Sequence, residues 1–156
     1  MKFLCDAMLA GLGRWLRAAG YDTKISESKA KDQEILACAI QEDRLLITRD
    51  RHFLEMKAAT ERVIFLSANS LEECIQTLSQ KVPIDWLFCP FSRCLLCNTL
   101  LIEPPQQNVA EQVPSAVFQR SEQFWYCPQC QKIYWQGSHT QHMLGQLRRW
   151  RKYLVR

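Results

Sequence analysis

Two cysteine pairs in the second half of the chain could bind a metal ion. Cys94 and Cys97 form one Cys-x-x-Cys pair, and Cys127 and Cys130 form another. Each pair offers two thiolates from one tight turn, and two pairs complete the four-sulfur shell of a structural zinc site. The segment between them, residues 98–126, is longer than usual, but the entropic cost of loop closure grows only slowly with length. We therefore predict one structural Zn²⁺, with two disulfides or free thiols as the alternative.

Three aspartates stand where a parallel sheet places its ligand-binding groups. Asp6 and Asp50 each end a predicted strand, and Asp32 opens a predicted helix. Ligands of open parallel sheets bind beyond the carboxyl ends of the strands, and all three positions share that edge. Carboxylates there suit Mg²⁺ or Mn²⁺, ions that orient a phosphodiester and activate a water molecule. The alternatives are a helix cap for Asp32, a turn residue for Asp50 and a solvated strand end for Asp6.

The elements that would position these aspartates alternate between strands and helices. Short apolar runs predict strands, and apolar residues three or four positions apart predict helices. In chain order the predicted elements are a strand over 2–5, a helix over 9–19 that stops at Gly20, a strand over 21–25, a helix from Asp32, strands over 44–48 and 62–66, and a helix from the capping box at Ser70. The second helix should have Asp32 as its N-cap and bury Ile35, Leu36, Ala39 and Ile40. This alternation predicts an α/β fold with a parallel sheet and helices on both faces.

The second half of the chain predicts a small ribbon and a terminal helix. Residues 104–114 form a polar loop between the cysteine pairs, and residues 132–135 predict a ribbon strand. Ser138 begins a second capping box. The helix after it should present one apolar face, formed by Met143, Leu147, Trp150 and Leu154.

Length, hydropathy and cysteine content limit the class of protein. The 156 residues suffice for two small domains, which we predict over residues 1–83 and 89–156 with a linker at 83–90. Hydrophobic residues make up 47% of the chain, enough for a packed core. No run of about 18 apolar residues and no signal peptide is found, so we expect no membrane association. Unpaired thiols such as Cys5 and Cys38, beside zinc thiolates, fit a reducing cytoplasm.

The net charge of +4 is unevenly distributed. Residues 1–88 hold 12 Lys and Arg against 13 Asp and Glu, whereas residues 89–156 hold 8 against 3. The first half could therefore hold a metal ion and the second an anionic polymer. The candidates for phosphate contacts are Arg14, Arg17, Arg49, His139, Arg148, Arg149, Arg151 and Lys152. Ion pairs with the aspartates, or a solvated face of the terminal helix, are the alternatives.

Three further residues have both an ordinary and a functional interpretation. His52 is expected to be a loop residue, because a carboxylate cage activates water without it. Tyr134 and Trp135 could stack on bases. Aromatic residues of small ribbons usually fill the core, and we expect this of at least one of them.

These motifs in combination resemble the Mut-seven C-terminal RNase family, a branch of the PIN-like nucleases. The resemblance rests on Asp6 followed by LAGLGRWLR at 9–17 and GYD at 20–22, DQEI at 32–35, LITRD at 46–50, the two cysteine pairs with Cys97-Asn98, FWYC at 124–127 and YWQGSH at 134–139. It implies a three-layer PIN-like α/β domain fused to a zinc ribbon. It also implies metal-dependent cleavage of RNA, with Mg²⁺ or Mn²⁺ as cofactor and no nucleotide cofactor.

The resemblance assigns roles by position. Asp6 and Asp50 match the metal-binding acids, and Asp32 matches the middle acid, with Glu34 as a substitute. PIN nucleases usually carry a fourth acid after the next strand, where residues 66–70 hold an asparagine but no carboxylate. The expected function is therefore a ribonuclease whose zinc ribbon helps to bind RNA. An RNA-binding module that does not cleave is the alternative.

Overall fold

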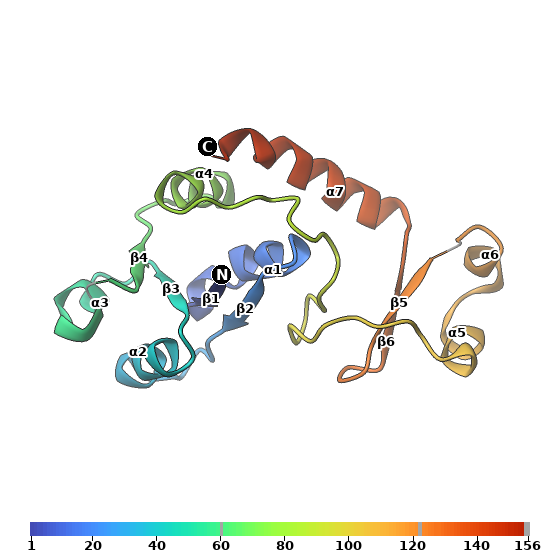
Figure 1. The fold of residues 1–156 in the computed structure, drawn as a ribbon, viewed down its shortest axis with the longest axis horizontal. Coiled ribbons are helices and arrows are strands. Elements are labelled where there is room, and N and C mark those ends of the chain that lie inside the picture. Colours follow the sequence, from blue (N-terminus) through green and yellow to red (C-terminus); the bar gives the residue numbers. More distant parts are fainter. Residues whose placement is uncertain (60, 122, 155–156) are drawn as a thin grey trace.

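The computed structural model describes residues 1–59, 61–121 and 123–154, which form an α/β part and an antiparallel ribbon (Figure 1). The strands in these ranges are β1 (Lys2–Cys5), β2 (Asp22–Ile25), β3 (Leu45–Thr48), β4 (Val63–Phe65), β5 (Phe124–Cys127) and β6 (Lys132–Trp135). The α-helices are α1 (Ala10–Ala18), α2 (Asp32–Gln41), α3 (His52–Glu55), α4 (Leu71–Lys81), α5 (Gln106–Gln112), α6 (Ser115–Phe118) and α7 (Ser138–Trp150). Short 3₁₀ helices are η1 (Ala7–Leu9), η2 (Lys57–Ala59) and η3 (Arg151–Tyr153).

The first four strands form a parallel sheet in the order β2-β1-β3-β4. In β1, Phe3 and Cys5 belong to the hydrophobic core on one side of the sheet, and Leu4 belongs to the core on the other. Central parallel strands are buried on both faces, which is why β1 and β3 are near-continuous apolar runs in the sequence. The alternating pattern predicted this parallel α/β sheet correctly.

Helices cover both faces of the sheet and make three layers (Figure 1). On one face, α1, α4 and α7 pack their apolar residues into the larger core. On the other face, α2 packs Ile35, Leu36 and Ala39 against Leu4 and Leu46. The three-layer architecture expected from the sequence is confirmed.

Two predicted helix boundaries are confirmed by their local geometry. Gly20 ends the first helical region at φ +100°, and a Cβ there would lie 2.3 Å from the carbonyl oxygen of Cys89. Only glycine fits this left-handed position at such close approach. At the start of α4, Ser70 Oγ accepts from Glu73 N at 3.2 Å, and Glu73 Oε2 accepts from Ser70 N at 3.2 Å. This is the predicted capping box.

Other local expectations were wrong. Asp32 is the first residue of α2 rather than its N-cap, which is Lys31, because the Asp32 carboxylate turns to a side-chain partner. Ile40 is 42% exposed, since the buried stripe of α2 ends at Ala39. The N-cap of α7 is the extended Gly137, with no side-chain capping bond.

The predicted polar loop at residues 104–114 contains a helix instead. Pro105 precedes α5, and Val109 and Val113, four residues apart, are buried. They form a small core with Tyr126 and Ile133 of the antiparallel ribbon strands β5 and β6. The apolar spacing within this polar segment was the signal for a helix.

The segment predicted as a linker is part of the main core. Ile84 and Trp86 are fully buried there. Leu147 and Trp150 of α7 join the same cluster, and the Trp150 ring meets the Trp86 ring edge-on at 5.3 Å. Trp150 Nε1 also donates to Glu72 Oε2 of α4 at 2.7 Å. The predicted linker at residues 83–90 thus contributes Ile84 and Trp86 to the core that α4 and α7 share.

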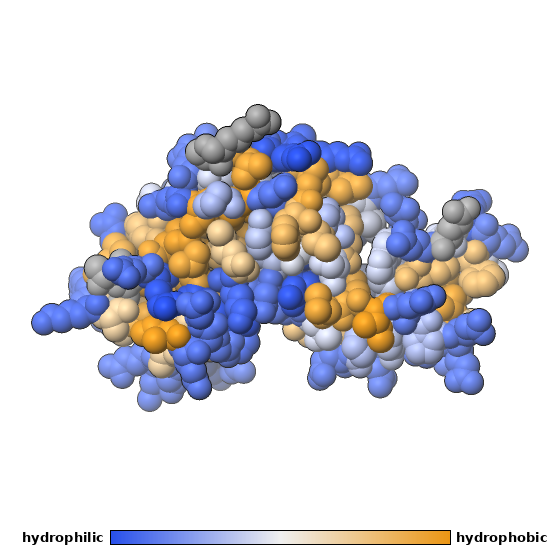
Figure 2. All heavy atoms as spheres, viewed as in Figure 1, coloured by the Kyte–Doolittle hydropathy of each residue, from blue (hydrophilic) through white to orange (hydrophobic). Residues whose placement is uncertain are grey.

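The surface is largely hydrophilic in the view of Figure 2, with hydrophobic residues gathered in patches over both the α/β part and the ribbon. In the part of the chain that the structure describes, no helix is long and apolar enough to cross a membrane. This agrees with the sequence, which contains no apolar run of that length.

Candidate functional site

The carboxyl edge of the sheet brings Asp6 and Asp50 together through Thr48. Asp6 follows β1, and its backbone N–H donates to Ile47 O of β3 at 3.0 Å. The fully buried Thr48 donates its hydroxyl to Asp6 Oδ2 at 3.1 Å and accepts from Asp50 N at 3.0 Å. One buried hydroxyl therefore orients the carboxylate of Asp6 and the backbone of Asp50. Both aspartates are half-buried at the edge where sequence analysis placed them.

Asp32 reaches the same edge through His52. Asp32 Oδ2 lies 2.8 Å from His52 Nδ1, and His52 N donates to Asp50 Oδ1 at 2.8 Å. The hydrogen bond with Asp32 raises the pKa of His52 above its ordinary value. The chain of contacts thus runs from Asp32 through His52 to Asp50. Sequence analysis expected an ordinary loop residue at position 52 and missed this contact, whose two partners are 20 residues apart.

The position of the missing fourth acid is occupied by structural contacts. Arg49 Nη2 donates to Asn69 Oδ1 at 3.1 Å, and Asn69 N donates to Glu73 Oε2 at 3.0 Å. Glu72 accepts from the aromatic residues Trp150 and Tyr153. The Asn69 amide is therefore engaged by Arg49, Glu73 caps α4, and Glu72 holds the C-terminal helices.

Arg17 cannot contact RNA as predicted. It is 5% exposed, and its Nε donates to Thr23 O at 2.8 Å. Its Nη1 donates to Leu95 O at 2.9 Å and Leu96 O at 2.8 Å. Burial lowers its pKa. Its guanidinium therefore joins α1 to the first cysteine pair, whereas Arg14, one turn earlier, is exposed.

The remaining predicted RNA contacts are accessible. Arg151 Nε lies 3.8 Å from Asp85 Oδ1, and Lys152 Nζ lies 4.8 Å from the centre of the Tyr153 ring. The exposed members of the predicted set on α7 and η3 are His139, Arg148, Arg149, Arg151 and Lys152. RNA contact by these residues stays a prediction.

The four predicted cysteines converge on one point. Their sulfur atoms all lie within 4.8 Å of one another, with Cys94 and Cys130 at 3.9 Å and Cys97 and Cys127 at 3.4 Å. Tetrahedral zinc with Zn–S bonds of about 2.3 Å separates its sulfurs by about 3.8 Å. None of the four forms a disulfide in the structure. The cluster has the ligands and the spacing to hold one zinc ion.

Neighbouring groups support the thiolates. Burial raises the pKa of Cys97, but hydrogen bonds with Thr99 outweigh it and lower the pKa to about 6. The Tyr134 hydroxyl lies 3.1 Å from Cys94 Sγ, and Cys130 N donates to Cys127 Sγ at 3.3 Å. Tyr134 thus contacts a metal ligand, as outer-shell partners of metal sites do.

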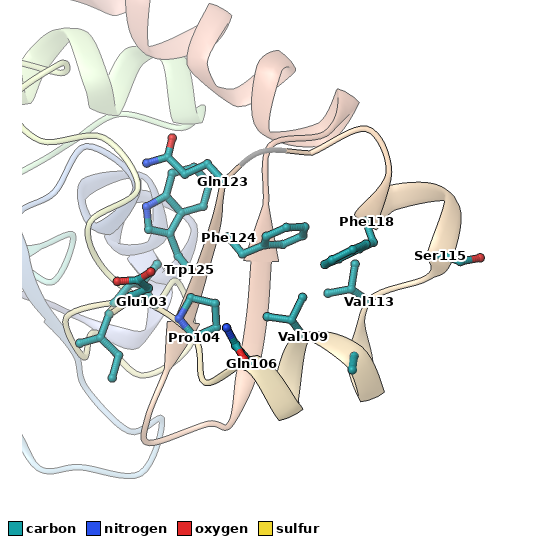
Figure 3. A pocket seen from close by; sticks show the side chains of 13 residues that line it. Glu103, Pro104, Gln106, Val109, Val113, Ser115, Phe118, Gln123, Phe124 and Trp125 are labelled. Atoms are coloured by element: carbon teal, nitrogen blue, oxygen red, sulfur yellow. The ribbon is translucent and has the colours of Figure 1, made fainter.

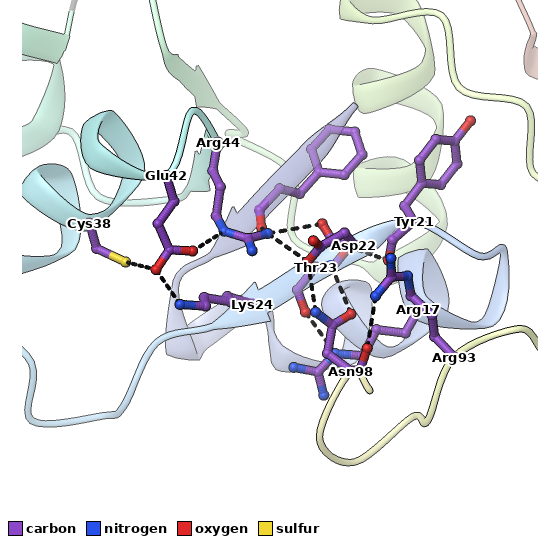
Figure 4. A network of polar contacts seen from close by, with 11 residues as sticks. Arg17, Tyr21, Asp22, Thr23, Lys24, Cys38, Glu42, Arg44, Arg93 and Asn98 are labelled. Carbon is purple, nitrogen blue, oxygen red and sulfur yellow. Dashed lines mark hydrogen bonds and ion pairs between the residues drawn. The ribbon is translucent and has the colours of Figure 1, made fainter. Parts of the chain in front are cut away.

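Asn98, which follows the first cysteine pair, lies against Asp22 and Thr23 of the edge strand β2 (Figure 4). Asn98, at φ 72°, accepts from Thr23 N at 2.9 Å and donates to Asp22 Oδ1 at 2.7 Å. Asp22 also accepts from Arg44 Nη1 at 2.7 Å. Burial raises the pKa of Asp22, but these hydrogen bonds outweigh it and the pKa is lowered. Sequence reasoning quoted Asn98 only as part of a motif and missed this docking role.

Within the described residues, the cysteines form a compact metal cluster and the three aspartates do not. The aspartates are joined by intervening hydrogen bonds instead. Cation binding by these three carboxylates stays a prediction.

Comparison with protein families gives a match to the Mut7-C RNAse domain over residues 1–147. The matched range includes the three aspartates, the four cysteines and most of α7. Comparisons with curated proteins and with solved structures give no match.

Proposed function

The chain belongs to the Mut7-C RNAse domain family, and from this premise we propose that it is a metal-dependent ribonuclease. The observation that carries the proposal is the buried Thr48 hydroxyl, which contacts both Asp6 and Asp50 at the carboxyl edge of the sheet. One hydroxyl thereby fixes both the Asp6 carboxylate and the backbone that carries Asp50. It supports a site where these side chains act together.

Asp6, Asp50 and Asp32 are the residues that would hold Mg²⁺ or Mn²⁺. Such an ion supplies activation of a water molecule and neutralises charge on a phosphodiester. The chain contributes orientation: Asp6 is held by Thr48, and Asp50 is held by the backbone of His52. The His52 ring holds Asp32. These hydrogen bonds thus orient the three carboxylates in the protein without a bound cation.

RNA would be held by cations around this edge and on the terminal helix. Arg14 is exposed on α1, and Arg49 lies beside Asp50. The basic residues of α7 and η3 would add phosphate contacts. Zinc at the four cysteines would hold the ribbon in place. Eight free thiols support a cytoplasmic setting.

The decisive experiment is RNA cleavage in Mn²⁺ or Mg²⁺ by the wild type and by Asp6→Asn. We expect the variant to lose cleavage while keeping its circular dichroism spectrum. Asp43→Asn is the matched control, because Asp43 is 84% exposed on its side chain and asparagine tolerates its φ of 54°. Equal cleavage by wild type and Asp6→Asn would remove Asp6 from the mechanism.

A second candidate is an RNA-binding protein that does not cleave. The observation in its favour is the engagement of Asn69 by Arg49 at the position where a fourth acid is expected. With fewer acids, a cation would bind more weakly. Tight RNA binding without cleavage by the wild type in Mn²⁺ would select this candidate.

A further inference from the structure

A groove of about 1010 Å³ lies in the ribbon, apart from the aspartates and the cysteines (Figure 3). Its walls are β5, residues 101–106 and the helices α5 and α6. The volume is at the upper end of the range for sites that bind small organic ligands. Neither the zinc cluster nor the carboxylate edge of the sheet explains it.

Aromatic rings form one side of the groove. Phe118 is 59% exposed, and its ring stacks on Phe124 with centroids 6.2 Å apart and planes at 18°. Val109 and Val113, buried in the ribbon core, line the groove beside these rings. Trp125 lies at the other end (Figure 3). The groove therefore offers a supported aromatic ring with an exposed surface.

Polar side chains complete the lining. Glu103, Gln106 and Gln123 line the groove and are exposed. A carboxylate accepts hydrogen bonds, and each amide both accepts and donates them. Flat apolar surface combined with such groups matches a nucleobase, which has a π-face and a hydrogen-bonding edge.

The charges around the groove limit how RNA could lie in it. Residues 101–125 hold three acids, Glu103, Glu111 and Glu122, against one cation, Arg120. The acids would repel a phosphate chain lying along the groove. Arg120, which is exposed two residues after Phe118, would contact the phosphate of a single base placed there.

We propose that this groove binds an unstacked nucleobase of single-stranded RNA, with Phe118 as the stacking platform. The proposal rests on the proposed function only in taking RNA as the ligand. It adds a base-binding site in the ribbon, distant in sequence from the aspartates.

The test compares two fluorescent probes in an Asp6→Asn background. One probe is an oligouridylate of about ten nucleotides, and the other is an abasic chain of the same length, which keeps the phosphates and lacks the bases. Stacking on one aromatic ring contributes about 1–3 kcal/mol, so the oligouridylate should bind about 5- to 150-fold more tightly. Phe118→Ala should remove most of that ratio and leave binding of the abasic chain unchanged.

Phe88→Ala is the matched control. Phe88 lies outside the groove, is 62% exposed, and stacks on Tyr21 with ring centroids 5.1 Å apart and planes at 19°. Its exposure and its stacking therefore resemble those of Phe118. It should keep the full ratio. A second measurement uses RNA with iodouridine, whose photochemical crosslinks should map to residues 118–125.

The outcomes are separable from those of the cleavage assay. An unchanged ratio in Phe118→Ala, or crosslinks confined to other segments, would overturn the base site even if the protein cleaves RNA. A higher affinity for the oligouridylate than for the abasic chain that is lost in Phe118→Ala would support the site, even if the wild type does not cleave RNA. A groove that takes an apolar peptide instead would give equal affinities for the two probes.

Discussion

Replacing Arg17 by methionine should destabilise the protein by about 3 kcal/mol. Three carbonyl oxygens, of Thr23, Leu95 and Leu96, accept from this one side chain. The bond to Thr23 O is buried and the other two are part-buried, and a buried acceptor left without a partner costs about 1–3 kcal/mol. Relief from burying the guanidinium offsets part of this cost, which places the expected loss at the low end of the sum. Net stabilities of domains are about 5–15 kcal/mol, so the loss is large.

The same substitution should also weaken zinc retention. Leu95 and Leu96 lie between Cys94 and Cys97, so Arg17 holds the turn that presents two of the four sulfurs. Urea unfolding followed by circular dichroism gives the stability. The rate of zinc transfer to a coloured chelator gives the retention.

Arg14→Met is the control for this prediction. Arg14 lies on the same helix and is exposed, so its replacement should change stability by no more than about 0.5 kcal/mol. Equal stability and equal zinc transfer for Arg17→Met and Arg14→Met would refute the reasoning. The ribbon would then be held to the sheet by other contacts, chiefly those of Asn98.

Three other expectations concern metal, RNA and acid. Elemental analysis of reduced protein should find about one zinc per chain, and finding none would contradict the cysteine site. Alanine in place of the four cations of the C-terminal segment should reduce the slope of log affinity against log salt concentration by about 0.7 per lost phosphate contact. The four are Arg148, Arg149, Arg151 and Lys152. An unchanged slope would mean that they form a solvated face. Hydrogen bonds from Lys24 and then Arg44 lower the pKa of Glu42 from 4.5 to about 2. This stabilisation is complete above pH 4.5 and is lost as the pH falls toward 2, so Glu42→Gln should show a flatter acid limb in urea titrations.

Features set by local sequence were predictable. Gly20 marked a helix end because its φ of +100° excludes other residues, and Ser70 marked a helix start because its cap partner is three residues away. The cysteine pairs were recognisable because each knuckle is a four-residue unit. Such signals require no knowledge of which segments meet in space.

Features set by distant partners were not predictable from the pattern. Arg17 looked like a phosphate contact because it lies on the helix that follows Asp6. Its acceptors, the carbonyl oxygens of Leu95 and Leu96, lie 78 and 79 residues away in the sequence. Trp86 looked like part of a linker, and only the return of α7 shows why it is fully buried. The sequence shows that a charged or aromatic side chain needs a partner, but it does not identify that partner.

Asn98, next to the first cysteine pair, caps the edge of the sheet that carries the aspartates. β2 is an edge strand, and the Asn98 side chain gives Thr23 N the acceptor that a further strand would supply. β2 leads directly to Ser26, whose hydroxyl accepts from Ala7 N, the residue after Asp6. A disturbance of the first cysteine pair would therefore act on the strand that supports the turn holding Asp6. Loss of zinc should impair the carboxylate edge through this path, even though no cysteine takes part in the proposed chemistry.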